Sequence, residues 1–181
     1  MKRNLSLFTL LLVILTSCSS EPTLQKFYVE HGSSPGYMTV DIAPNFIGTE
    51  HMKLTRDQEE ALKSLHKFNV LVYQTDSLDV THKKYNVEKD KVKSLVKNEY
   101  EELMKMNDGK SGASISTKGE GEHIDEFVVF VHNEDNGFGV VRVLGDDMTP
   151  TNVLTIAGLL QESKLNMAQF KPLKDLMAKK K

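Results

Sequence analysis

Residues 124–144 read IDEFVVFVHNEDNGFGVVRVL, and this stretch decides the fold. Its first part, residues 124–132, is the strongest candidate strand in the chain because it is rich in Val and Phe. Asn136-Gly137 then supplies the residue types that a tight hairpin bend favours, and residues 138–144 return as a second strand. The stretch therefore predicts an antiparallel β-hairpin.

Three further strands are expected N-terminal to this hairpin. Residues 37–42 alternate between apolar and polar side chains, as in a half-buried strand. Residues 68–73 contain a run that is apolar on both faces, which is typical of a central strand or one covered on both sides. Residues 113–117 form a short strand, followed by a glycine-rich turn. The expected sheet therefore has about five strands.

Helical patterns separate these strands. Thr55 and Gln58 have the spacing of a capping box, which predicts a helix to about residue 66. Residues 86–106 carry apolar side chains every three or four positions among Lys and Glu, and this is the clearest helix of the chain. Thr149 followed by Pro150 predicts the start of the last helix.

The order of these elements predicts a single α+β domain over residues 23–162. Hairpin-linked strands with separate helices favour a mainly antiparallel sheet with helices packed on one face, and a ferredoxin-like variant is one such arrangement. Outside the domain we expect a signal peptide at residues 1–17, a tether at residues 18–22 and a Lys-rich tail at residues 163–181.

The N-terminal segment predicts where the domain resides. A basic start, an apolar run over residues 5–15 and small residues before the single cysteine are typical of a secretory signal peptide. Leu15-Thr16-Ser17-Cys18 resembles the lipobox of bacterial lipoproteins, in which the cysteine is acylated and becomes the new N-terminus. We therefore expect lipid attachment at Cys18 and a domain held at a membrane of the cell envelope, facing the periplasm.

Two other interpretations of this segment are weaker. A transmembrane helix over residues 5–15 would rise roughly 16 Å, against a hydrocarbon core of about 30 Å. An ordinary cleaved signal would leave an unpaired thiol in an exported protein, which is an uncommon arrangement. Acylation of Cys18 accounts for the single cysteine without this difficulty.

Length and charge narrow the class of protein further. The chain has 181 residues and a formal net charge of -2, with acidic and basic side chains mixed along it. Such a balance gives no electrostatic footprint for nucleic acid. The length after processing suits one domain with its own hydrophobic core, which matters because no second cysteine is present for a disulfide.

The sequence contains one pattern similar to a phosphate-binding loop and one similar to a calcium-binding loop, but neither has the required residue at each position. Gly109-Lys110-Ser111 resembles the end of a phosphate-binding loop, but Met104 occupies the position of the required glycine. In the acidic stretch 132–139, His132 stands where a calcium loop needs its first acidic ligand. A solvated hairpin tip is the favoured interpretation of that stretch.

One cluster of candidate metal ligands crowds a turn, and its members are Glu120, Glu122, His123 and Asp125. An adventitious divalent-metal site is conceivable there, but a charged loop that keeps a sheet edge soluble is favoured. The six histidines include no pair spaced three or four residues apart. We therefore expect no catalytic, cofactor-binding or metal-binding residues.

The sequence resembles an uncharacterised family of Bacteroidota lipoproteins, the domain of unknown function DUF4252. The matching parts are the alternating strand 37–42, the segment Tyr100-Glu101-Glu102-Leu103-Met104, and the strand pair 124–144 ending in Gly145-Asp146. The resemblance spans residues 24–160 and implies a lipid-anchored envelope domain. It implies no activity and no site residues.

These observations predict a non-enzymatic interaction or sensing domain, with the membrane reached through the N-terminal lipid and an envelope protein as a possible partner. Two alternatives stay open. A hydrolase could assemble its site from residues distant in the chain, and a carrier of an apolar ligand would require a large apolar cavity.

Overall fold

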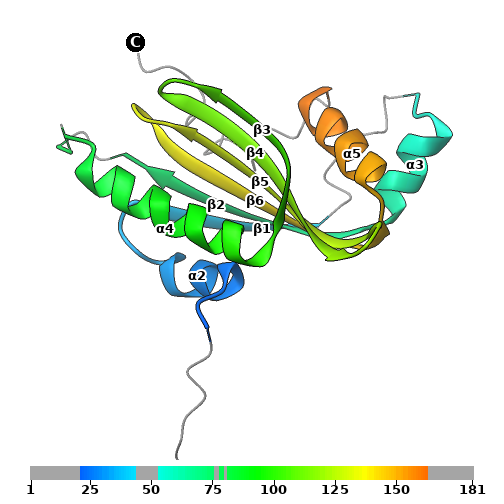
Figure 1. Ribbon diagram of the computed structural model, residues 1–181, viewed down its shortest axis with the longest axis horizontal. Helices are drawn as coiled ribbons and strands as arrows, with labels where there is room; N and C mark the ends of the chain where they lie inside the picture. The colour runs from blue at the N-terminus through cyan, green and yellow to red at the C-terminus, as the bar shows by residue number, and fades with distance from the viewer. Residues whose placement is uncertain (1–20, 44–52, 76–77, 80, 163–181) are drawn as a thin grey trace, which may run out of the picture.

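The computed structural model describes residues 21–43, 53–75, 78–79 and 81–162 (Figure 1). Its centre is a six-stranded sheet in the order β1-β2-β6-β5-β4-β3, and every neighbouring pair is antiparallel. The strands are β1 (Tyr37–Ile42), β2 (Leu65–Gln74), β3 (Glu101–Asp108), β4 (Ser111–Glu120), β5 (His123–Asn133) and β6 (Gly137–Met148). The α+β class with an antiparallel sheet is confirmed. The ferredoxin-like variant is not shown by this strand order.

Within the described residues, four helices accompany the sheet, and they lie on both of its faces. They are α2 (Leu24–His31), α3 (Arg56–Lys63), α4 (Lys83–Glu99) and α5 (Pro150–Glu162). Helices α2 and α4 pack on one face, whereas α3 and α5 pack together on the other face near one end of the sheet (Figure 1). The expectation that all helices share one face is therefore wrong.

Strand β2 shows why helices pack on both faces of the sheet. Val70 and Val72 belong to the hydrophobic core under α3 and α5, whereas Leu71 and Tyr73 belong to the core under α2 and α4. Successive side chains of a strand point to opposite faces, so a run of apolar residues must be buried on both. The two-sided pattern that the sequence displays at this strand is confirmed.

The expectation of about five strands is also corrected, because residues 101–106 are a strand and not the end of a helix. Helix α4 ends at Glu99, and β3 follows directly with Glu101. Met104 and Met106 pair with Ile115 and Ala113 of β4. Tyr100, the residue between the two elements, is buried in the α2/α4 core.

Other local predictions are confirmed with small shifts of boundary. The capping box is present, since the Thr55 amide donates to the Gln58 side chain at 2.9 Å and the Gln58 amide to the Thr55 hydroxyl at 3.3 Å. The helix that it starts ends at Lys63, and Leu65 already belongs to β2. The predicted signal peptide, the anchor at Cys18 and the Lys-rich tail lie outside the described residues.

Candidate interaction site

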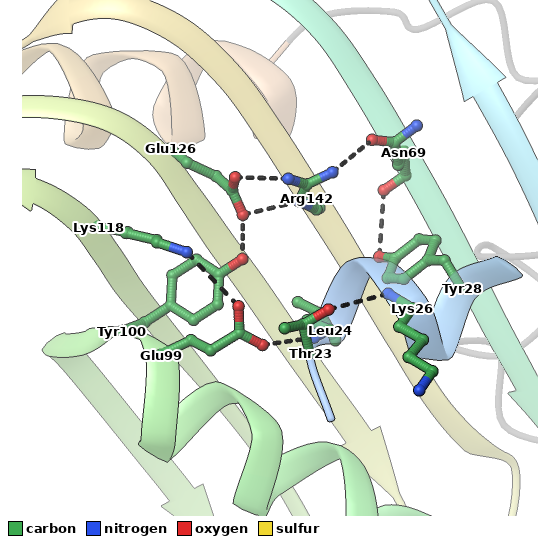
Figure 2. Close-up of polar contacts among 10 residues, drawn as sticks. All are labelled: Thr23, Leu24, Lys26, Tyr28, Asn69, Glu99, Tyr100, Lys118, Glu126 and Arg142. Atoms are coloured by element: carbon green, nitrogen blue, oxygen red, sulfur yellow. Dashed lines mark hydrogen bonds and ion pairs between the residues drawn. The ribbon is translucent and has the colours of Figure 1, made fainter. Parts of the chain in front are cut away.

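A buried ion pair lies at the centre of the sheet face that α2 and α4 cover. Glu126 of β5 and Arg142 of β6 join through two hydrogen bonds, in which Arg142 Nε and Nη2 donate to the two carboxylate oxygens at 2.7 and 2.6 Å (Figure 2). The Glu126 residue is only 7% exposed. A bidentate pair of this kind is stable in the interior because each charge satisfies the other.

Neighbouring side chains complete the hydrogen bonding of this pair. The Tyr100 hydroxyl donates to Glu126, and Arg142 Nη1 donates to the Asn69 side chain at 3.4 Å (Figure 2). Burial, together with the hydrogen bond to the Glu126 carboxylate, raises the pKa of Tyr100 well above its ordinary value. Burial opposes the charge on Arg142, but the Glu126 carboxylate raises the Arg142 pKa overall. The phenol therefore stays protonated and the guanidinium stays charged.

Helix α2 is hydrogen-bonded to the sheet beside this cluster through Tyr28, and to α4 through its first residue. The Tyr28 hydroxyl lies 2.9 Å from the carbonyl oxygen of Val140 and 3.3 Å from that of Asn69. At the start of the helix, the Leu24 amide donates to the Glu99 carboxylate at the end of α4 (Figure 2). The first helix after the predicted tether is thus fixed to the sheet.

A hollow of about 610 Å³ opens beside the cluster. Its charged groups are already paired, since Lys67 lies 2.8 Å from Asp41 and Arg142 is held by Glu126. The hydrogen bond from Lys67 contributes most to lowering the pKa of Asp41. Because these charges satisfy one another, the hollow serves the internal cluster better than it would serve an external charged ligand.

The opposite sheet face is covered only in part, and its open part carries exposed methionines. Helices α3 and α5 pack over one end of the sheet (Figure 1). Beyond them, Met104 and Met106 on β3 are 44% and 63% exposed, and Met38 on β1 is 43% exposed. Exposed apolar patches on a folded domain are typical of interaction surfaces.

Strand β3 also forms an edge of the sheet. Its eight residues are all exposed, and within the described part of the chain it pairs only with β4. An edge strand presents unpaired amide and carbonyl groups to which another strand can add. We name the β3 edge together with Met104 and Met106 the β3 surface.

The other residues that the sequence singled out lie near the two ends of β5, and His132 lines a hollow that Met106 of the β3 surface also lines. His123 forms a hydrogen bond with Asp147, and this bond raises the pKa of His123. Within the described residues, no group of three or more His, Cys, Asp or Glu side chains is placed to hold a metal ion. His132 lies at the end of β5 with its Nδ1 3.4 Å from the Tyr85 hydroxyl, and the stretch after it is a hairpin turn.

Sequence reasoning missed the Glu126–Arg142 pair, although a signal for it exists. Arg142 interrupts a run of Val and Leu in β6, and Glu126 precedes a run of Phe and Val in β5. Charged residues inside two strands that pair as a hairpin indicate a buried ion pair whenever their side chains point to the same face. The β3 surface was missed because its strand was expected to be helical.

The fold and the cluster define an α+β domain of one antiparallel sheet, braced on one face by a buried ion pair and partly open on the other. The chain belongs to the family described as a domain of unknown function, DUF4252, whose model matches residues 28–155. The match runs from within α2 into α5 and so includes every strand.

The comparisons with curated proteins and with solved structures found no significant match. Among the described residues, no helix combines the length and the apolar composition that crossing a bilayer requires.

Proposed function

We propose that this protein is a lipid-anchored protein of the cell envelope, and that its domain is a non-enzymatic interaction module facing the periplasm. The observation that carries the anchor is the sequence Leu15-Thr16-Ser17-Cys18 after an apolar run of signal-peptide length. Two or more acyl chains at Cys18 would make the attachment stable, because a single chain of myristoyl size holds a protein only marginally.

The distance from the anchor supports a defined orientation of the domain. Five residues lead from Cys18 to Thr23, and an extended chain of that length spans at most about 18 Å. Helix α2 begins at Leu24 and is fixed to the sheet through Tyr28 and Glu99. The face that carries α2 would therefore lie nearest the membrane, with the open face directed away from it.

The partner that fits the β3 surface is an extended segment of another envelope protein, added to β3 as a further strand. Main-chain hydrogen bonds to the edge would supply affinity, and apolar side chains spaced two residues apart would contact Met104 and Met106. The flexible thioether side chains adapt to such contacts. Glu101 and Asp108 at the two ends of β3 favour basic residues at the ends of the partner segment.

The anchor is tested by growing cells with labelled palmitate. Label is expected in the wild-type protein and not in a Cys18→Ser variant. The anchor is refuted if label is missing from both proteins, or if the Cys18→Ser variant still takes it up.

The interaction surface is tested in living cells with a photo-crosslinking amino acid at one position at a time. We expect a discrete adduct with one other envelope protein from position 106, and its loss when Met104 is also changed to Lys. Position 87 on α4 serves as the control, because Val87 is a similarly exposed apolar residue at 49% exposure on the other side of the domain.

Three results would contradict the proposed partner. Equal adducts from positions 87 and 106 would indicate unspecific contact. An adduct that joins two copies of this chain would replace the partner with self-association. An adduct within one chain, to residues 163–181, would show that the Lys-rich tail is the occupant of the β3 surface.

A further inference from the structure

A second cavity lies between α4 and the strands β3, β4 and β5, on the sheet face opposite to Met104 and Met106. Its volume is about 270 Å³. Helix α4 contributes two lysines and a valine, and the strands contribute hydroxyl and aromatic side chains; the members used here are Lys93, Val96, Lys97, Ser114, Ser116 and Phe130. The cavity thus combines positive charge, hydroxyl groups and an apolar wall.

Three lysines and one carboxylate, that of Glu102, line this cavity, and in the part of the chain that the structure describes two of the lysines are not neutralised by an ion pair. Among the described residues, neither Lys93 nor Lys97 has a carboxylate within ion-pair distance, whereas Lys105 at the rim lies 3.4 Å from Glu102. The ammonium of Lys93 lies 5.9 Å from the centroid of the Phe130 ring. An anion held between the lysines would gain from both charges.

The Lys93 side chain shows the cost of leaving this charge uncompensated. Burial lowers the pKa of Lys93, and the neighbouring charges of Lys89 and Lys105 lower it further, while Asp90 opposes them. A bound anion would reverse this balance, because an opposite charge nearby favours the charged form of a lysine.

Ser116 supplies an independent observation. The residue is 4% exposed and lines the cavity together with Ser114. The Ser116 hydroxyl can donate one hydrogen bond. An oxygen atom of a ligand would accept this hydrogen bond.

The other side of the cavity is apolar, which favours a ligand with an apolar part. Val96 and the rings of Tyr100 and Phe130 line the cavity beside the lysines. We propose that this cavity binds an amphiphilic anion, with its oxyanion, a phosphate or a carboxylate, between Lys93 and Lys97 and its apolar body against Phe130 and Val96. The inference does not depend on the proposed partner, since it uses other residues on the other sheet face.

The full chain can be titrated with octyl phosphate and with octanoate, followed by the NMR amide shifts of Ser114 and Ser116. Octanol has the same apolar body without the charge, and inorganic phosphate has the charge without the body. We expect saturable binding of octyl phosphate or octanoate that is at least ten-fold tighter than binding of either control. If octanol binds as tightly as the charged probes, the proposal is overturned.

Paired variants assign the binding to this cavity. Lys93→Met with Lys97→Met is expected to weaken octyl phosphate binding at least ten-fold. Lys83→Met with Lys84→Met makes the same change of charge on exposed positions of the same helix, and its affinity should match the wild type. Equal affinities in the two double variants would refute the site.

Ser116→Ala tests the contribution of the hydroxyl separately. The variant should fold normally, because alanine is smaller than serine, and it should bind octyl phosphate several-fold more weakly, because the donor to the ligand is lost. Unchanged affinity in this variant would contradict the role given to Ser116.

The source of the ligand is distinguished with vesicles. If the oxyanion belongs to a membrane lipid, vesicles of phosphatidylglycerol should bind the full chain, and the Lys93→Met, Lys97→Met variant should bind them less than the Lys83→Met, Lys84→Met control. If only the soluble probes depend on Lys93 and Lys97, the ligand is a free small molecule. Both results support the cavity as an anion site.

Discussion

Arg142 carries a full positive charge among apolar side chains of β6, and it depends on one carboxylate, that of Glu126. We predict that Arg142→Met lowers the free energy of unfolding by about 3–5 kcal/mol, because the Glu126 charge is left buried without its partner. Replacing both residues, with Glu126→Leu and Arg142→Met, should restore most of the loss. Urea unfolding of the three proteins measures both effects, and a loss below about 1 kcal/mol in Arg142→Met would contradict the prediction.

His132 predicts a dependence of stability on pH. Burial, with the charges of Lys93 and Lys89, lowers its pKa from 6.5 to about 4 in the folded state. Between these values the unfolded chain binds a proton that the folded chain does not, so the stabilisation is complete above about pH 6.5 and is lost as the pH falls towards 4. The expected loss is about 1–2 kcal/mol, because the side chain is partly exposed and solvent screens its interactions.

The measurement compares urea unfolding of the wild type and of His132→Asn at several values between pH 7 and pH 4. Carboxylates titrate in both proteins, so only the difference between the two curves reports His132. That difference should change over the stated range. Parallel curves would show that the pKa of His132 is not lowered in the folded protein.

Individual helices and strands could be predicted from the sequence wherever the local pattern agreed with the final packing. The capping box at Thr55, the alternating β1 and the hairpin of β5 and β6 needed no knowledge of distant residues. Residues 101–106 differ, because Glu, Leu, Met and Lys are good helix formers. Pairing with β4 overrides that local preference, and no feature within the segment itself reveals its pairing partner.

Two glycines differ in whether the structure has room for a side chain. Gly119 has none, whereas at Gly158 only helix propensity matters. A Cβ added at Gly119 in β4 would lie 2.0 Å from the carbonyl oxygen of His123, which is backbone and cannot move aside. We predict that Gly119→Ala lowers the free energy of unfolding by more than about 2 kcal/mol. A Cβ at Gly158 in α5 meets nothing within 4 Å, and Gly158→Ala should stabilise by about 0.5–1 kcal/mol.

Thermal unfolding of the two glycine variants measures this contrast. A Gly119→Ala protein as stable as the wild type would mean that the turn between β4 and β5 adopts another conformation. A destabilised Gly158→Ala protein would mean that the α5 position is packed more closely than its surroundings indicate.

For the whole molecule, the expectation that the helices pack on one face of the sheet conflicted with a pattern in the sequence itself. The apolar run at residues 70–72 indicates burial on both faces, whereas helices on one face leave the other uncovered. The structure follows the run, with α2 and α4 on one side and α3 and α5 on the other. The open part of the second face was beyond sequence reasoning, since it depends on where those helices lie.

The position of each strand predicts the order of its hydrogen exchange. Strand β6 lies between β2 and β5 near the centre of the sheet, so its amides should be the most protected. Strand β3 is an exposed edge and should exchange first among the strands. Exchange measured by mass spectrometry on the full chain tests this order. Protection of β3 equal to that of β6 would show that another segment covers the edge.

The strand order also has a consequence for how the chain is assembled. Four successive strands, β3 to β6, form a meander of local contacts, but β2 joins the sheet only through β6. Contacts so distant in sequence form late, because closing a long loop costs entropy. The strands β1 and β2 therefore cannot pair with the rest of the sheet until residues 137–148 are present, and a chain truncated before them lacks the strand that joins β1 and β2 to β3, β4 and β5.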